Sequence, residues 1–139
     1  MRTLAIFCAV IAVLMVNPIA NACKCAPPPP PKEALLRADA VFVGTISRVE
    51  RIVQGGQLIG LRATFTVTRY WKGITTPIVT VTTPPAPSIC GFDFKTEQSY
   101  LIYASGAGTE FSTNICTRTK LIRDVDPEEQ QLGPAKQTK

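Results

Sequence analysis

The sequence predicts a mainly β protein, a small closed barrel of about five strands with one or two short helices. Segments rich in β-branched and aromatic residues recur at spacings of about 10 to 20 residues, which is typical of small all-β domains. Glycine- and proline-rich turns separate these segments, and the pattern of alternating strands and long helices that marks βαβ units is not seen. A Greek-key OB-type barrel is the first choice and an open sandwich the second, because periodicity alone does not distinguish them.

Residues 1–22 are predicted to be a secretory signal peptide. Arg2 supplies a positive charge, residues 4–16 form an almost unbroken apolar run, and Ala20-Asn21-Ala22 matches a signal-peptidase cleavage site. The run is shorter than the roughly 20 apolar residues of a membrane anchor, so no stable membrane span is expected. The protein is therefore predicted to be secreted, to the extracellular space or a periplasm, with Cys23 as its N-terminus.

An extended arm and a short helix are expected to follow. Residues 26–31 contain five successive prolines, which fix φ and favour the polyproline II conformation. Helix-forming residues then follow the last proline, and this pattern predicts a helix over Lys32 to Ala38.

Strand signals continue from there as far as Ile122. Residues 40–50 are rich in Val, Ile and Phe, and Gly44 within them indicates a bulge or a sharp bend. Residues 61–71 alternate apolar and polar side chains, and residues 55–57 mark the turn before them. The remaining predicted strands are residues 77–83, residues 99–105, and one or two strands within residues 111–122.

One domain is predicted for residues 23–123, since a chain of this length can form one compact core and is too short for two. The polar tail, residues 124–139, lacks periodicity and is expected to be disordered. The chain has 15 Lys and Arg against 10 Asp and Glu, a formal net charge of +5. These charges are scattered and form no basic stripe, so no nucleic-acid partner is expected, and a monomer is the default state.

The cysteines predict two disulfides. Cys8 lies in the predicted signal peptide, which leaves Cys23, Cys25, Cys90 and Cys116, an even set in an oxidising compartment. Four cysteines allow three pairings, but a Cys23–Cys25 bond would close a strained ring, so each is expected to reach Cys90 or Cys116. A bridge over such a long loop contributes about 4 kcal/mol in the chain-entropy model. A four-thiolate zinc site is the alternative, although export and the lack of a CxxC pair favour disulfides.

The sequence predicts that the protein is not an enzyme. It contains no histidine, which excludes Ser-His and Cys-His nucleophilic sites and His-bearing zinc centres. Asp93 and Glu97 flank a turn without a catalytic arrangement, and Gly55-Gly56 is a hairpin turn rather than a phosphate-binding loop. We expect no cofactor and no intrinsic metal site.

The predicted N-terminus is the remaining chemical group of interest. An α-amino group has a pKa near 8, and the neutral amine together with its own carbonyl oxygen forms a five-membered chelate for a metal ion. Disulfides at Cys23 and Cys25 and the prolines that follow would preorganise this chelate for the open zinc position of a partner. Spacing alone favours a simpler interpretation, in which the bridges staple a mobile arm to the barrel.

The chain also resembles a known family. An ordered series of short motifs from Cys23 to about Ile122 carries the resemblance: C-x-C, PPPPPKEAL, AVFVGTI, RYWKG, PSICGF, YLIYAS and NICTRT. The series resembles the N-terminal, netrin-like domain of the tissue inhibitors of metalloproteinases (TIMPs). This resemblance implies a five-stranded OB-type barrel with short helices, and it implies the disulfides Cys23–Cys90 and Cys25–Cys116.

The same resemblance implies that the protein is a secreted metalloproteinase inhibitor. The amino nitrogen and carbonyl oxygen of Cys23 would chelate the catalytic zinc of a metalloendopeptidase and displace its water, and Lys24 would enter the specificity pocket. The other residues of the protease-contact ridge would be Cys25, Ala26, Pro27, Ser88, Ile89 and Cys90.

Two features depart from the family pattern. The residue after the first cysteine is usually small in the family, whereas Lys24 is long and cationic, and an ammonium group is costly to bury unless a carboxylate meets it. The family's third cysteine falls near Leu35, and a C-terminal cysteine-rich subdomain is absent from the sequence. The chain therefore resembles a minimal, single-domain relative.

Two other hypotheses remain open. The protein could be a non-inhibitory netrin-like module that binds a protein or polysaccharide through its sheet face, which Trp71 and the scattered basic residues would permit. A tryptophan of this kind is more often a core residue or a turn anchor. Cys23 could instead be the acylated cysteine of a bacterial lipoprotein, although Ala20 occupies the position where that signal normally has leucine.

Overall fold

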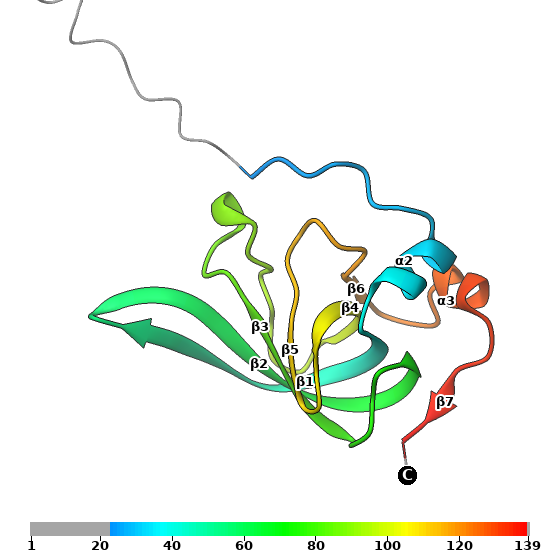
Figure 1. Ribbon diagram of the computed structural model, residues 1–139. Coiled ribbons are helices and arrows are strands. Elements are labelled where there is room, and N and C mark those ends of the chain that lie inside the picture. Colours follow the sequence, from blue (N-terminus) through cyan, green and yellow to red (C-terminus); the bar gives the residue numbers. More distant parts are fainter. Residues whose placement is uncertain (1–22, 139) are drawn as a thin grey trace, which may run out of the picture.

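The computed structural model describes residues 23–138, so the predicted signal peptide and its Cys8 lie outside the described residues. The fold is mainly β, as predicted, and its strands form one mixed sheet (Figure 1). The α-helices of this part of the chain are α2 (Pro31–Arg37) and α3 (Pro127–Leu132), and Pro87–Ile89 form a 3-10 turn, η1. The strands are β1 (Ala40–Gln54), β2 (Gln57–Lys72), β3 (Ile78–Thr83), β4 (Ser99–Ala107), β5 (Glu110–Ser112), β6 (Lys120–Ile122) and β7 (Lys136–Gln137).

Hydrogen bonding joins the strands in the order β1-β2-β3-β5-β4-β6, with β7 beside β2. The paired strands are antiparallel except β3 and β5, which run parallel. β1 also pairs with β4 over residues 40–45, so the ladder β1-β2-β3-β5-β4 returns to β1. Each of these five strands therefore has at least two strand neighbours along its length.

β1 and β2 form a hairpin that is longer than the sequence predicted. They pair as far as Gln54 opposite Gln57, and the turn residues Gly55 and Gly56 have φ angles of 56° and 76°. A two-residue hairpin turn of this kind requires positive φ at both positions, which glycine adopts without steric cost. Beyond Thr45, β1 pairs with β2 alone, and this part of the hairpin projects to the left of the sheet in Figure 1.

Gly44 lies at the bulge that the sequence predicted in β1. The register between β1 and β2 shifts between Val43 and Gly44. A Cβ atom at Gly44 would lie 3.0 Å from the carbonyl oxygen of Thr66, so the two strands approach each other closely at this point. Because a bulge bends and twists its strand, it helps β1 to pair with β2 on one side and β4 on the other.

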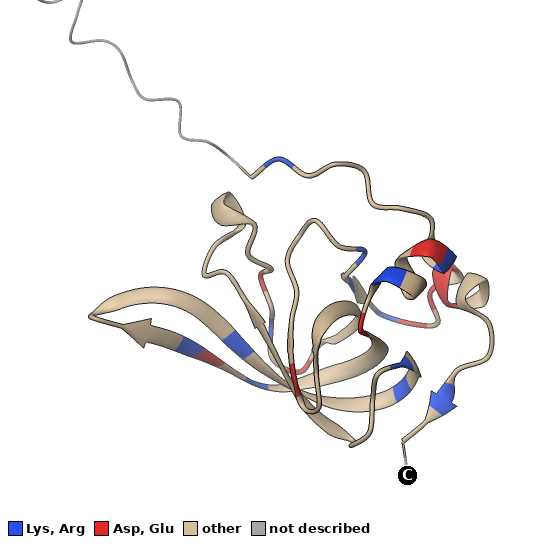
Figure 2. Cartoon of the chain, in the orientation of Figure 1, with Lys and Arg blue, Asp and Glu red and all other residues tan. Residues whose placement is uncertain are grey.

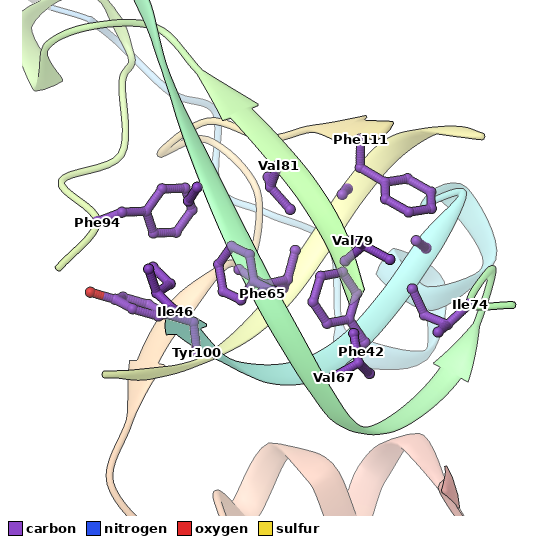
Figure 3. Packing of buried hydrophobic residues seen from close by; sticks show 14 residues of the cluster. Phe42, Ile46, Phe65, Val67, Ile74, Val79, Val81, Phe94, Tyr100 and Phe111 are labelled. Atoms are coloured by element: carbon purple, nitrogen blue, oxygen red, sulfur yellow. The ribbon is translucent and has the colours of Figure 1, made fainter. Parts of the chain in front are cut away.

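Side chains on the two faces of the sheet form two hydrophobic clusters. Alternation along β1 sends Phe42 to the first cluster and Val41 and Val43 to the second, so this strand is buried on both faces. In the first cluster the ring of Phe65 packs edge-to-face against Phe94, with the centroids 5.5 Å apart. Figure 3 shows this cluster, whose labelled members are Phe42, Ile46, Phe65, Val67, Ile74, Val79, Val81, Phe94, Tyr100 and Phe111.

The second cluster lies beneath the two α-helices. Ala34 of α2 and Leu132 of α3 pack with Tyr103 of β4, and this packing shields the outer face of β1 and β4 from water. Helix α2 agrees with the predicted helix to within one residue at each end. Its C-terminal end is held by Lys72, whose Nζ donates to the carbonyl oxygens of Leu36 (3.0 Å) and Ala38 (2.5 Å). Within residues 23–138, neither helix is long and apolar enough to cross a bilayer.

The C-terminal tail differs from the prediction of disorder for residues 124–139. Helix α3 begins with a capping box, in which the Asp126 carboxylate accepts from the backbone N–H of Glu128 (2.8 Å) and Glu129 accepts from the N–H of Asp126 (3.1 Å). β7 then pairs with β2. We call residues 126–138 the C-terminal strap. The prediction failed because composition treats Glu128 and Glu129 as solvated charges, whereas Glu129 is buried against Arg69 of β2 and Glu128 against Arg118 of the loop before β6.

Candidate functional site

Two disulfides attach the N-terminal arm, residues 23–30, to two loops of the sheet. Cys23 is bonded to Cys90 and Cys25 to Cys116, with Cα–Cα distances of 5.2 Å and 5.1 Å. This is the pairing that the resemblance implied. The Sγ atom of Cys116 also lies 3.8 Å from that of Cys23 and 3.9 Å from that of Cys90. These sulfurs form a compact cluster, but as disulfide sulfurs they are not the thiolates that a zinc site needs.

The loop before Cys90 is a tight turn that exposes Ser88 and Ile89 to solvent. The carbonyl oxygen of Ala86 accepts from the N–H groups of Ile89 (3.1 Å) and Gly91 (2.8 Å). Cys90 itself has a left-handed backbone, with φ of 69°, which is uncommon for a residue other than glycine. The disulfide and these hydrogen bonds stabilise that conformation, so the loop presents a defined surface.

The arm begins directly beside this turn. The backbone nitrogen of Cys23 donates to the carbonyl oxygen of Ser88 at 3.1 Å, next to the bond between Cys23 and Cys90. Figure 1 shows the arm starting near η1 and passing across the ends of the loops toward α2. The residues predicted for the ridge therefore lie together, and we call them the N-terminal ridge: Cys23, Lys24, Cys25, Ala26, Pro27, Ser88, Ile89 and Cys90.

The N-terminal ridge is open to solvent over most of its length. Residues 24–27 are exposed, and so are Ser88 and Ile89, the latter with 55% of its surface accessible. Lys24 makes no ion pair within the part of the chain that the structure describes. An exposed isoleucine and a free ammonium group next to a pinned backbone form a surface that could contact another protein.

Sequence analysis missed the third side of this surface. Ile115 is 37% exposed, and its backbone N–H donates to the carbonyl oxygen of Cys90 at 3.0 Å. The side chain of Asn114 accepts from the N–H of Cys116 (2.8 Å) and shapes the loop. The signal that could have found it is a repeated pair: Ile115 precedes Cys116 as Ile89 precedes Cys90.

Sequence analysis also missed Arg118, which fixes the far end of the arm. Its Nη1 donates to the carbonyl oxygen of Pro29 at 3.1 Å, while Nε and Nη2 donate to the two carboxylate oxygens of Glu128 at 2.6 Å and 2.8 Å. In Figure 2, acidic residues (red) lie on both α-helices and basic residues (blue) lie on α2 and on the neighbouring segments of the sheet. A lone arginine in a Thr-rich stretch carries no sequence signal for such a role.

The electrostatics of Glu128 explain why it stays ionised. Burial alone would raise the pKa of this carboxyl group, but hydrogen bonds from Arg118, Tyr103 and Lys120 outweigh burial and lower the pKa to about 2. The Tyr103 hydroxyl donates to Glu128 at 2.7 Å, and burial together with this carboxylate raises the pKa of Tyr103. The cluster is therefore a fixed ion pair with a neutral tyrosine at neutral pH.

No protein-family model matches the sequence, and a search of curated proteins found no match. The resemblance to the TIMP family therefore remains a prediction. The fold and the site together define a mixed-β domain whose N-terminal segment is held on its surface by two disulfides.

Proposed function

We propose that the mature chain begins at Cys23 and is a secreted inhibitor of a zinc metalloendopeptidase, with a netrin-like domain of the TIMP kind. The α-amino nitrogen and the carbonyl oxygen of Cys23 would ligate the zinc of the protease and displace its water. The observation that carries this proposal is the position of Cys23, which is pinned to Cys90 and to the Ser88 carbonyl on an exposed ridge. We expect neither catalytic activity nor a bound cofactor in the protein itself.

The contact between Cys23 and Ser88 supports the chelating role. In the cleaved protein the donor at 3.1 Å from the Ser88 oxygen would be a terminal amine. A neutral amine has two hydrogens and one lone pair, so donation of one hydrogen to Ser88 orients the lone pair. Because the disulfide also fixes Cys23, the entropy of ordering the chelate is lost on folding and not on binding.

Lys24 indicates which class of protease the protein would inhibit. As the residue after the zinc ligand, it would point toward the specificity pocket of the protease. An ammonium group in an apolar pocket is costly to bury, whereas a carboxylate in the pocket makes burial favourable. We therefore propose that the target protease has an acidic residue in its specificity pocket. We expect Lys24→Ser to shift inhibition toward proteases with apolar pockets.

The proposed fold is a closed, five-stranded Greek-key barrel of the OB type. The strand pairings support it, because the ladder β1-β2-β3-β5-β4 returns to β1. The first hydrophobic cluster supports it as well, since its side chains come from all five of these strands. A barrel of this kind leaves its loops free to carry the ridge.

The decisive experiment compares the mature protein with forms whose N-terminus is blocked. Mass spectrometry of the secreted protein should give a chain that starts at Cys23, with both disulfides formed and no acyl group. This protein should inhibit at least one zinc metalloproteinase in a panel. Either N-terminal acetylation or one added alanine before Cys23 should abolish inhibition, because both convert the amine of Cys23 into an amide. Full inhibition by the alanine-extended protein would rule the mechanism out.

Lys24 also favours a second candidate function. If no protease of the panel accepts a cation at this position, the ridge would instead belong to a non-inhibitory netrin-like module that binds an acidic protein or polysaccharide. A correctly processed protein that inhibits no zinc protease, yet binds such a polyanion and loses binding in Lys24→Ala, would support this second candidate.

A further inference from the structure

One short segment holds the N-terminal arm at two points. Cys116 is bonded to Cys25, and two residues later Arg118 donates from Nη1 to the carbonyl oxygen of Pro29. The two attachment points on the arm are four residues apart, which is about 12 Å along a polyproline II rod. A stiff rod that is held at two such points has a fixed direction.

The arm can form few other contacts of this kind. Residues 27–31 are prolines and have no N–H group to donate. Within residues 23–138, the bond from Arg118 is the hydrogen bond that ties residues 26–29 to the rest of the protein. Without it, no hydrogen bond among the described residues would hold the arm between Cys25 and Pro30.

Arg118 is itself held in place by Glu128. The guanidinium group is planar, so fixing its Nε and Nη2 edge against the two oxygens of one carboxylate also fixes the direction of Nη1. Glu128 is 5% exposed and also accepts from the Tyr103 hydroxyl (2.7 Å) and from the Lys120 ammonium group (2.9 Å). These contacts hold the Glu128 carboxylate in one position. Its two bonds to Arg118 then hold the guanidinium group in place.

We propose that Glu128, acting through Arg118, is a positioning residue for the N-terminal ridge. The C-terminal strap then does more than cover the sheet, because it sets the direction in which the arm leaves Cys25. The effect on inhibition rests on the proposed function, whereas the effect on the order of the arm does not.

Glu129 provides a matched control on the same helix. It is 6% exposed, and its carboxylate binds Arg69 in the same two-point manner, at 2.7 Å and 2.8 Å. Arg69 lies on β2 and makes no hydrogen bond to the arm within the described residues. Glu128→Gln and Glu129→Gln therefore each neutralise a carboxylate that binds an arginine at two points, but only the first lies on the path to Pro29.

The test measures the arm and its activity separately in wild type, Glu128→Gln and Glu129→Gln. Nitrogen-15 relaxation should give an Ala26 amide order parameter near 0.85 in wild type and Glu129→Gln, and clearly lower in Glu128→Gln. For a protease that the wild type inhibits, Glu128→Gln should raise the inhibition constant about tenfold, the factor expected for re-ordering about one backbone residue. Glu129→Gln should change it less than about twofold. Its loss of thermal stability should be the smaller of the two, because Glu128 also binds Lys120 and Tyr103.

A second variant keeps the test decisive if Glu128→Gln does not fold. Arg118→Lys retains a cation opposite Glu128 but cannot also reach Pro29 with a rigid third donor, so it should loosen Ala26 in the same way. Equal order parameters in wild type and Arg118→Lys, or equal changes in the two glutamate variants, would overturn the proposal. If the wild type inhibits no protease, the proposed function fails, and the relaxation data still decide the positioning role.

Discussion

The two ends of the described chain are both held on the outside of the sheet, but by opposite means. The N-terminal arm has one charged residue, Lys24, and is attached by two disulfides. The C-terminal strap contains no cysteine and is attached by ion pairs of Glu128 and Glu129. Polyproline cannot donate hydrogen bonds, so the arm depends on covalent bonds, whereas the strap can bury its charges against arginines of β2 and of the loop before β6.

The means of attachment decides what each end can do. A covalent tether holds its segment without covering it, and the arm remains exposed over residues 24–28. An ion-pair tether works best when it is shielded from water, and the two glutamates of the strap are accordingly buried. An exposed yet rigid segment suits contact with another protein, whereas a buried charged segment suits structural support.

Removing a disulfide of the arm has the largest expected effect. In the double variant Cys25→Ser, Cys116→Ser, the free energy of unfolding should fall by about 4 kcal/mol, because the bridge spans a sequence separation of 91 residues. Chemical denaturation measures the loss. Because the ion pairs of Glu128 and Glu129 remain, α3 should stay folded in this variant, and loss of its native NMR signals would show that the strap depends on the disulfide.

Acid should weaken the strap while both disulfides of the arm stay intact. The pKa of Glu128 is about 2 in the folded protein against an ordinary 4.5, so its stabilisation is fully present above pH 4.5 and is lost as the pH falls toward 2. The loss should reach on the order of 3 kcal/mol. Denaturation of wild type and Glu128→Gln between pH 7 and pH 2 measures it, and parallel curves for the two proteins would be inconsistent with this role of Glu128.

The hydrogen bond to the strap just after α3 should have the smallest effect. The indole N–H of Trp71 donates to the carbonyl oxygen of Gly133 at 2.9 Å, and Trp71→Phe should cost about 1 kcal/mol through loss of this bond and some packing. Tyr70→Phe is the neighbouring control, since the Tyr70 hydroxyl makes no hydrogen bond within residues 23–138. Thermal denaturation should show a larger loss for Trp71→Phe; equal losses would mean that Gly133 does not anchor the strap.

Local sequence patterns predicted the regular elements well. The prolines before Lys32 predicted the start of α2, the alternation of residues 61–71 predicted the central part of β2, and Gly44 predicted a bulge. Each of these patterns reports a backbone preference of the residues themselves or of their immediate neighbours. The N-terminal ridge could be predicted only through the resemblance, because cysteine spacing alone left the pairing open.

The sequence by itself determined where the strands and turns lie, how stiff the arm is, and that four cysteines follow the predicted signal peptide. Only the tertiary structure decided that Cys116 and Arg118 secure one arm together, and that Glu128 and Glu129 have cationic partners. The physical reason is that backbone preference is local, whereas an ion pair such as Arg69 with Glu129 joins residues 60 positions apart. Composition cannot distinguish a solvated glutamate from one whose partner is brought to it by packing of the sheet.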